Sequence, residues 1–118
     1  MKVLFDHNVD RRLRKHLPGH SISTTREMRW EKLENGHLLN IAASALFDVV
    51  VTIDKKIEHQ QNLKLLPLAV VVLDAVSSAL PSLVVFAPFL LDLLKAPLDR
   101  ALYVVNQDGV VLRLDAPR

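Results

Sequence analysis

The chain has 118 residues, half of them hydrophobic, with a formal net charge of +2 and no cysteine. This length suffices for one domain with a buried core, and the balance of apolar and charged residues excludes a disordered chain. The missing cysteines exclude a disulfide framework, a thiolate zinc site and a cysteine nucleophile. The most apolar stretch is too short to span a bilayer, so we expect no membrane partner. From the length we expect a single domain over 1–118, and the absence of cysteine suits the reducing cytoplasm.

Short apolar strands and helices alternate in the first half of the chain. A strand over 3–5 is followed by a helix over 10–17, whose leucines stand four residues apart and which ends at a Pro-Gly pair. A second strand covers 20–24, and a polar segment follows over 26–33. The stretch NGHLLNIAASALF then predicts the clearest helix, and DVVVTID predicts a strand that is covered on both faces.

The second half continues the alternation and ends in a β-rich tail. A helix over 55–65 precedes the buried strand LAVVVL, and a very apolar helix over 83–94 should kink at Pro88. Two β-rich runs, ALYVV and VVLRL, flank an Asp-Gly turn and predict a hairpin extension over 101–118. Together these elements predict an α/β fold with a mostly parallel sheet, helices on both of its faces and a C-terminal β-hairpin.

Two aspartates follow predicted strands at equivalent positions. Asp6 comes directly after the first strand, and Asp54 comes after the strand 49–53. Neighbouring parallel strands would bring both carboxylates to one edge of the sheet, where their repulsion favours a divalent cation such as Mg²⁺. Such a metal could activate water and stabilise charge on a phosphoryl group. The simpler alternative is that each aspartate caps the helix that follows it.

Histidines and basic residues near these aspartates are further candidates. His37 lies in the first turn of the NGHLLNIAASALF helix, where its imidazole could bind a metal or transfer a proton, or could simply be solvated. Arg11 and Lys55 could attract a nucleic-acid backbone, or belong to solvated helix surfaces. The three glycines cannot form a dinucleotide or Walker A phosphate loop, and no serine-hydrolase elbow is present.

Three segments, taken together, resemble one family. They are VLFDHNVDRRLRKHLPGH, TTREMRWEKLENGHLLNIAASALFDVVVTIDKKIEHQQN and LAVVVL, and the similarity that they carry extends over residues 2–95. Their order and spacing are similar to those of small prokaryotic PIN-like proteins related to VapC-type toxin ribonucleases. The resemblance implies a three-layer α/β/α sandwich in which acidic residues bind Mg²⁺ or Mn²⁺ to hydrolyse RNA. Asp6 and Asp54 match two of the family's aspartates, whereas His7 and His37 stand where relatives usually have acidic residues.

These observations leave three functions open. The first is a metal-dependent ribonuclease, which as a toxin would pair with an antitoxin-like protein. It gives roles to six residues: Asp6 and Asp54 at the metal, Asn8 and His37 in catalysis, and Arg11 and Lys55 on RNA. The second is a non-catalytic PIN-like module that binds RNA, a protein or a second copy of itself as a homodimer. The third is a receiver domain phosphorylated on Asp54, although the last strand ends in Asn106-Gln107 where a receiver has a lysine.

Overall fold

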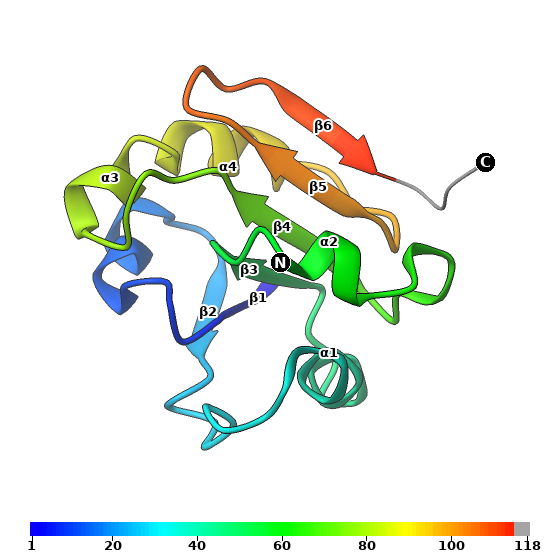
Figure 1. Cartoon of the computed structure of the whole chain (residues 1–118). Coiled ribbons are helices and arrows are strands. Elements are labelled where there is room, and N and C mark those ends of the chain that lie inside the picture. Colours follow the sequence, from blue (N-terminus) through cyan, green and yellow to red (C-terminus); the bar gives the residue numbers. More distant parts are fainter. Residues whose placement is uncertain (115–118) are drawn as a thin grey trace.

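A six-stranded sheet in the order β2-β1-β3-β4-β5-β6 forms the centre of the molecule (Figure 1). The structure is a computed structural model, and it describes residues 1–114. The parallel strands are β1 (Lys2–Phe5), β2 (Ser21–Thr24), β3 (Val49–Thr52), β4 (Ala69–Leu73) and β5 (Leu102–Val105), and β6 (Val111–Leu114) runs antiparallel to β5. The predicted mostly parallel sheet and C-terminal hairpin are confirmed, while residues 115–118 of the predicted extension lie outside the described residues.

Helices cover both faces of this sheet, which makes three layers (Figure 1). One face packs against the 3₁₀ helix η1 (Arg11–His16) and the helices α3 (Leu80–Val84) and α4 (Ala87–Leu93). The other face packs against α1 (Asn35–Ser44), α2 (Ile57–Gln60) and the 3₁₀ helix η2 (Leu63–Leu65). Every residue of β3 and β4 is buried, as the continuous apolar runs predict. Within residues 1–114, no helix is both long and apolar enough to cross a membrane.

Three predicted helices differ from those in the structure. The segment 10–17 forms a 3₁₀ helix, in which Asp10 caps the first turn by accepting a hydrogen bond from the backbone N–H of Arg12. The helix predicted over 55–65 is interrupted at Gln61, where the backbone is extended, and so divides into α2 and η2. The kink predicted at Pro88 is wrong because α3 and α4 are separate helices. Pro88 lies in the first turn of α4, where its missing N–H breaks no helical hydrogen bond.

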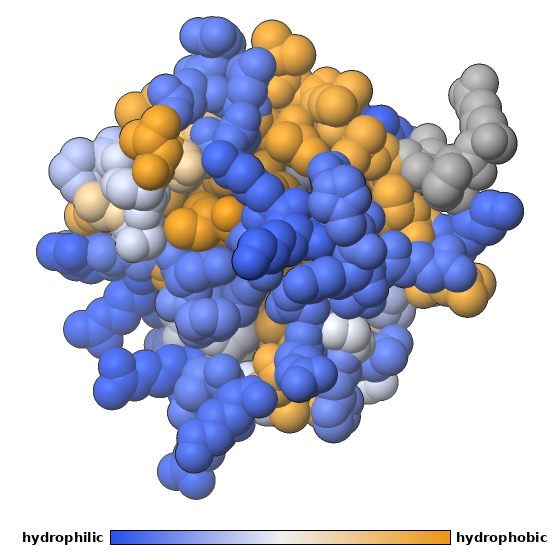
Figure 2. Space-filling model, in the orientation of Figure 1, coloured by the Kyte–Doolittle hydropathy of each residue, from blue (hydrophilic) through white to orange (hydrophobic). Residues whose placement is uncertain are grey.

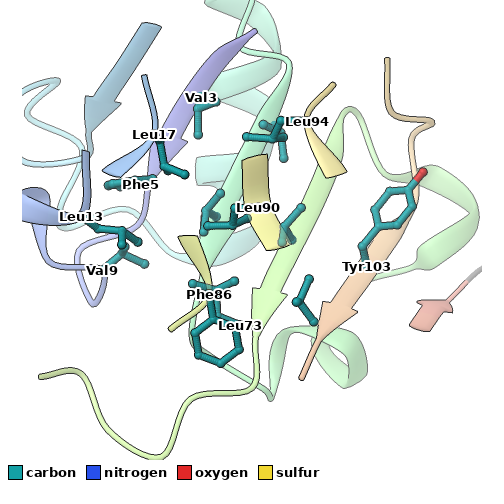
Figure 3. Packing of buried hydrophobic residues seen from close by; sticks show 14 of the residues in the cluster. Val3, Phe5, Val9, Leu13, Leu17, Leu73, Phe86, Leu90, Leu94 and Tyr103 are labelled. Atoms are coloured by element: carbon teal, nitrogen blue, oxygen red, sulfur yellow. The ribbon is translucent and has the colours of Figure 1, made fainter. Parts of the chain in front are cut away.

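Large apolar side chains fix β1 against the helices (Figure 3). Four side chains are completely buried in one hydrophobic cluster: Phe5 of β1, Leu13 of η1, Phe86 directly before α4, and Leu90 of α4. Burial of each such side chain stabilises the fold by roughly 1.5–3 kcal/mol. Strand β1 is therefore fixed in the sheet by the helical layer that packs on it, and this packing also positions the loop after β1.

The C-terminal hairpin leaves apolar side chains at the surface. Figure 2 shows hydrophobic residues in the upper part of the molecule, where β5 and β6 lie in Figure 1. Val110 and Leu112 are 61% and 58% exposed. Gly109 turns the chain with φ of +86°, and a Cβ atom there would lie 2.6 Å from Cε1 of Phe89. The turn thus packs closely against α4, and glycine is the residue that fits it.

Candidate functional site at the carboxyl ends of β1 and β3

Strand β1 lies between β2 and β3, so the strand order reverses at the boundary between β1 and β3. Open parallel sheets bind ligands outside the carboxyl ends of their strands at such a reversal. Asp6 directly follows β1, and its backbone N–H donates a hydrogen bond of 2.9 Å to the carbonyl of Val51 in β3. Asp54 follows the end of β3 by two residues. The fold therefore brings the segments that carry both predicted aspartates to this point.

The hydroxyl of Thr52 connects the two segments. Thr52 is fully buried, and its Oγ1 donates a hydrogen bond of 2.9 Å to Oδ2 of Asp6. The same oxygen accepts a hydrogen bond of 3.1 Å from the backbone N–H of Asp54. One threonine side chain thus sets the position of the Asp6 carboxylate relative to the backbone of Asp54.

The carboxylate of Asp6 is buried and paired with its neighbour in sequence. Asp6 is only 3% exposed, and its Oδ1 accepts a hydrogen bond of 2.8 Å from the backbone N–H of His7. The imidazole Nδ1 of His7 lies 3.0 Å from the same oxygen, and 66% of the His7 side chain is exposed. His7 therefore connects a buried carboxylate with the surface.

Asn8 closes the network between the loop after β1 and the end of β3. Its Oδ1 accepts a hydrogen bond of 3.3 Å from the backbone N–H of Ile53. Its Nδ2 lies 3.3 Å from Oγ1 of Thr52. These contacts give Asn8 a positioning role: they hold the loop that carries Asp6 against the segment that leads to Asp54.

Asp54 organises the chain before α2. Its Oδ1 accepts a hydrogen bond of 3.0 Å from the backbone N–H of Lys56, a turn that aspartate side chains commonly form. Its Oδ2 accepts a hydrogen bond of 3.3 Å from Nδ2 of Asn35 at the start of α1, and Asn35 also donates to Oε1 of Gln60. Asp54 thus forms a local turn ahead of α2, whose N-cap residue is Lys56 and which has no side-chain cap. Each oxygen of Asp54 retains room for a further ligand.

Two hollows meet at His7. The first has a volume of about 400 Å³ and is lined by Asp6, Arg11 and residues that follow β2. The second has a volume of about 480 Å³ and is lined by Asp54, by Asn35 and its neighbours at the start of α1, and by Gln60 and Gln61 at the end of α2. His7 lines both hollows. A ligand at this edge of the sheet could therefore contact both aspartate segments by passing over His7.

Of the three other predicted site residues, one lines a hollow at His7 and two do not. Arg11 lines the hollow that contains Asp6. Lys55 forms an ion pair with Asp74 and lines a separate hollow beside β4. His37 is exposed on α1 and belongs to the lining of neither hollow at His7. The structure thus brings Arg11 together with Asp6, but not Lys55 or His37.

Sequence reasoning gave no role to Thr52 and Asn35, which make the central contacts. Thr52 is visible in the sequence as part of the Thr-x-Asp stretch that ends β3, and Asn35 as the residue that begins α1. Their partners lie 46 and 19 residues away, and no local pattern signals those contacts. The Thr-x-Asp stretch was thus a signal for the position of Thr52, but not for its partner.

The site has few acidic or imidazole groups for a metal. Within the part of the chain that the structure describes, no three His, Asp or Glu side chains are grouped as the ligands of an ion would be. Comparison with protein-family models, curated proteins and solved structures finds no match for this chain. Fold and site define a small α/β protein whose polar site lies where the strand order of a mostly parallel sheet reverses.

Proposed function

We propose that the protein is a metal-dependent ribonuclease of the PIN-like type, acting on RNA in the cytoplasm. The observation that carries this proposal is the buried carboxylate of Asp6, which Thr52 ties to the backbone of Asp54 at the strand-order reversal. The resemblance of three sequence segments to PIN-like proteins supports the same activity. A toxin-like role with an antitoxin-like protein partner belongs to this proposal.

The free acceptor positions at the site fit a hard divalent cation. Oδ2 of Asp6 and each oxygen of Asp54 accept one hydrogen bond, whereas a carboxylate oxygen offers about two acceptor positions. Mg²⁺ or Mn²⁺ needs few protein ligands of this kind and takes its remaining ligands from water. Asp6 and Asp54 would hold the metal, which when bound supplies an activated water and stabilises charge on the phosphoryl group.

The other residues of the site have three roles: they exchange protons, position the two aspartate segments and attract phosphate. His7 places an exposed imidazole beside the carboxylate of Asp6, where it can give a proton to a group in either hollow or take one from it. Asn8 and Thr52 keep the two aspartate segments in register. Arg11 lines the hollow beside Asp6 and can attract a phosphate.

An RNA cleavage assay tests this function. We would incubate labelled single-stranded RNA with the protein in Mg²⁺, in Mn²⁺ or in EDTA, and compare wild type with Asp6→Asn and Asp54→Asn. The matched control is Asp92→Asn, because Asp92 is an exposed carboxylate on α4. We expect cleavage that requires the metal and falls at least about 100-fold in both site variants. A folded wild type that cleaves nothing with either metal contradicts the proposal.

A second candidate is a non-catalytic module that binds RNA, a protein or another copy of itself. Two observations favour it: residues 1–114 contain no group of three metal ligands, and the imidazole of His7 already occupies one oxygen of Asp6. Binding of RNA without cleavage, unaffected by EDTA, would select this candidate over the ribonuclease.

The receiver alternative has support from topology but not from the site. The parallel strands follow the order 2-1-3-4-5, which is a common order of doubly wound sheets. However, Asn106 follows β5, and its side chain accepts hydrogen bonds from the N–H groups of Asp108 and Val110 in the hairpin turn. No lysine there can pair with a phosphoryl group on Asp54. An unchanged mass after incubation with a small phosphodonor would remove this alternative.

A further inference from the structure

The hollow beside Asp6 contains more than the proposed metal ligands require. It lies at the carboxyl ends of β1 and β2 and has a volume of about 400 Å³. Among its lining residues are Arg11 at the start of η1, and Thr25 and Arg26 directly after β2. Hydrogen-bond donors and acceptors in this hollow are used very unequally, and that difference indicates what it binds.

Two carboxylates of the hollow, Asp6 and Asp10, already accept hydrogen bonds within the protein. Both oxygens of Asp6 accept hydrogen bonds, from Thr52 on one side and from His7 on the other. Asp10 accepts hydrogen bonds from the backbone and the guanidinium of Arg12, and these bonds lower the pKa of Asp10 to about 2. These carboxylates are thus bonded within the protein, apart from the acceptor position on Oδ2 of Asp6 that the proposed metal would take.

The donors, in contrast, remain available. Thr25 is only 1% exposed, and its Oγ1 has no hydrogen-bond partner within residues 1–114. Buried hydroxyl groups are nearly always bonded, so an unpartnered hydroxyl in a residue that lines the hollow calls for a missing ligand or water. Because this oxygen is itself buried, a ligand reaches it by a rotation of the Thr25 side chain towards the hollow. The guanidinium groups of Arg11 and Arg26 are exposed and form no hydrogen bond or ion pair with the residues that the structure describes. Arg11 is near enough to Asp10 to contribute weakly to its lowered pKa.

We propose that this hollow is a phosphate-binding subsite that holds a backbone phosphate of single-stranded RNA through Arg11, Arg26 and the hydroxyl of Thr25. A phosphate brings acceptor oxygens only, and arginine guanidinium groups bind it through paired, charge-assisted hydrogen bonds. Because His7 lines both hollows, a strand held here continues over His7 towards Asp54. The choice of RNA rests on the proposed function, whereas phosphate binding itself requires no metal.

Three carboxylates line this hollow and oppose a phosphate there: Asp6, Asp10 and Glu31. Those of Asp6 and Asp10 accept hydrogen bonds from neighbouring protein groups. Glu31 is exposed and lines the same hollow, so its carboxylate repels a phosphate in the subsite. Its removal therefore has the opposite effect from removal of the arginines. We expect Glu31→Gln to bind RNA more tightly than wild type, by about threefold, because it removes a repulsive charge at short range. A general loss of fold could not tighten binding in one variant and weaken it in its neighbours. The matched control Arg100→Gln, which changes the net charge as Arg11→Gln and Arg26→Gln do, separates a local effect from a general effect of charge.

The test is binding of fluorescently labelled single-stranded RNA in EDTA, followed by anisotropy. We expect Arg11→Gln and Arg26→Gln each to weaken binding about five- to tenfold and to reduce the dependence of log affinity on log salt by about one unit. Thr25→Val should weaken binding about threefold without lowering stability, because its hydroxyl has no partner to lose. Arg100→Gln is the matched control, since Arg100 lines a different hollow together with Leu46 and Leu98.

A second measurement locates the ligand without any substitution. Inorganic phosphate titrated into the labelled wild-type protein should shift the backbone amide signals of Thr25 and Arg26 before those of Arg100. The proposal is overturned if Arg26→Gln and Thr25→Val bind RNA as wild type does, or if Glu31→Gln weakens binding. Phosphate shifts at Thr25 without RNA binding overturn the assignment to RNA. Because all samples lack metal, absence of cleavage in the ribonuclease assay leaves these outcomes unchanged.

Discussion

Replacement of Thr52 by valine removes the hydroxyl that joins the two halves of the site. Valine keeps the β-branched shape that suits the end of β3, so the change deletes hydrogen bonds with little change in volume. It leaves Oδ2 of Asp6 without its donor and the N–H of Asp54 without its acceptor. Both groups lie where the loop after β1 meets the end of β3.

The magnitude follows from these two lost contacts. A hydrogen bond to a charged group contributes about 1.5–3 kcal/mol, and Asp6 is too buried to exchange it for a full water shell. The N–H of Asp54 belongs to a half-buried residue and can bind water instead, so it adds little. We expect Thr52→Val to lower the free energy of unfolding by about 2–3 kcal/mol. The matched control is Thr25→Val, another buried threonine, whose Oγ1 has no partner in residues 1–114 and whose loss should cost nothing.

Equilibrium unfolding in urea, followed by circular dichroism, measures both variants. A loss of 2–3 kcal/mol corresponds to a fall of about 1–2 M in the urea midpoint at an unchanged slope. The midpoint of Thr25→Val should stay at or above that of wild type. If the two variants unfold within 0.5 M of each other, Thr52 does not hold the site together as described; that margin is about a third of the expected effect.

Two further predictions concern the turn and the response to acid. Gly109→Ala should lower the free energy of unfolding by about 1 kcal/mol more than Gly19→Ala. Both glycines have positive φ, but only a Cβ atom at 109 would overlap Phe89. Urea unfolding of both variants measures the difference, and equal losses would contradict the prediction. Arg12 holds the pKa of Asp10 at about 2 by hydrogen bonding, so Asp10 contributes stability above about pH 4 that is lost as the pH falls towards 2. Arg12→Gln should flatten the stability profile over that interval, and an unchanged profile would contradict the cause assigned to the shift.

The strands could be predicted from the sequence because their burial leaves a direct trace in it. The runs VVVT and AVVVL are apolar at every position, since helices cover both faces of β3 and β4. Helix boundaries were less predictable. Gln61 interrupts the segment after β3, and Pro88 starts a new helix rather than bending an existing one. Such breaks depend on how the chain packs against the sheet, which short-range periodicity does not record.

The site could be predicted only where it coincides with the ends of strands. Asp6 and Asp54 were found because each follows a buried run of residues. The contacts of Thr52 and the empty donor position of Thr25 depend on residues that are distant in sequence, so they could be seen only in the folded chain. The placement of Lys55 beside Asp74, away from Asp6, likewise depends on where β4 ends.

The most direct test of the account is calorimetric titration of the protein with Mn²⁺. If Asp6 and Asp54 form one metal site, wild type should bind a single ion, and Asp6→Asn and Asp54→Asn should each weaken binding at least about tenfold. Asp92→Asn, the exposed control on α4, should bind as wild type does. No heat of binding to wild type at millimolar Mn²⁺, or wild-type affinity in Asp54→Asn, would contradict a metal site shared by the two aspartates.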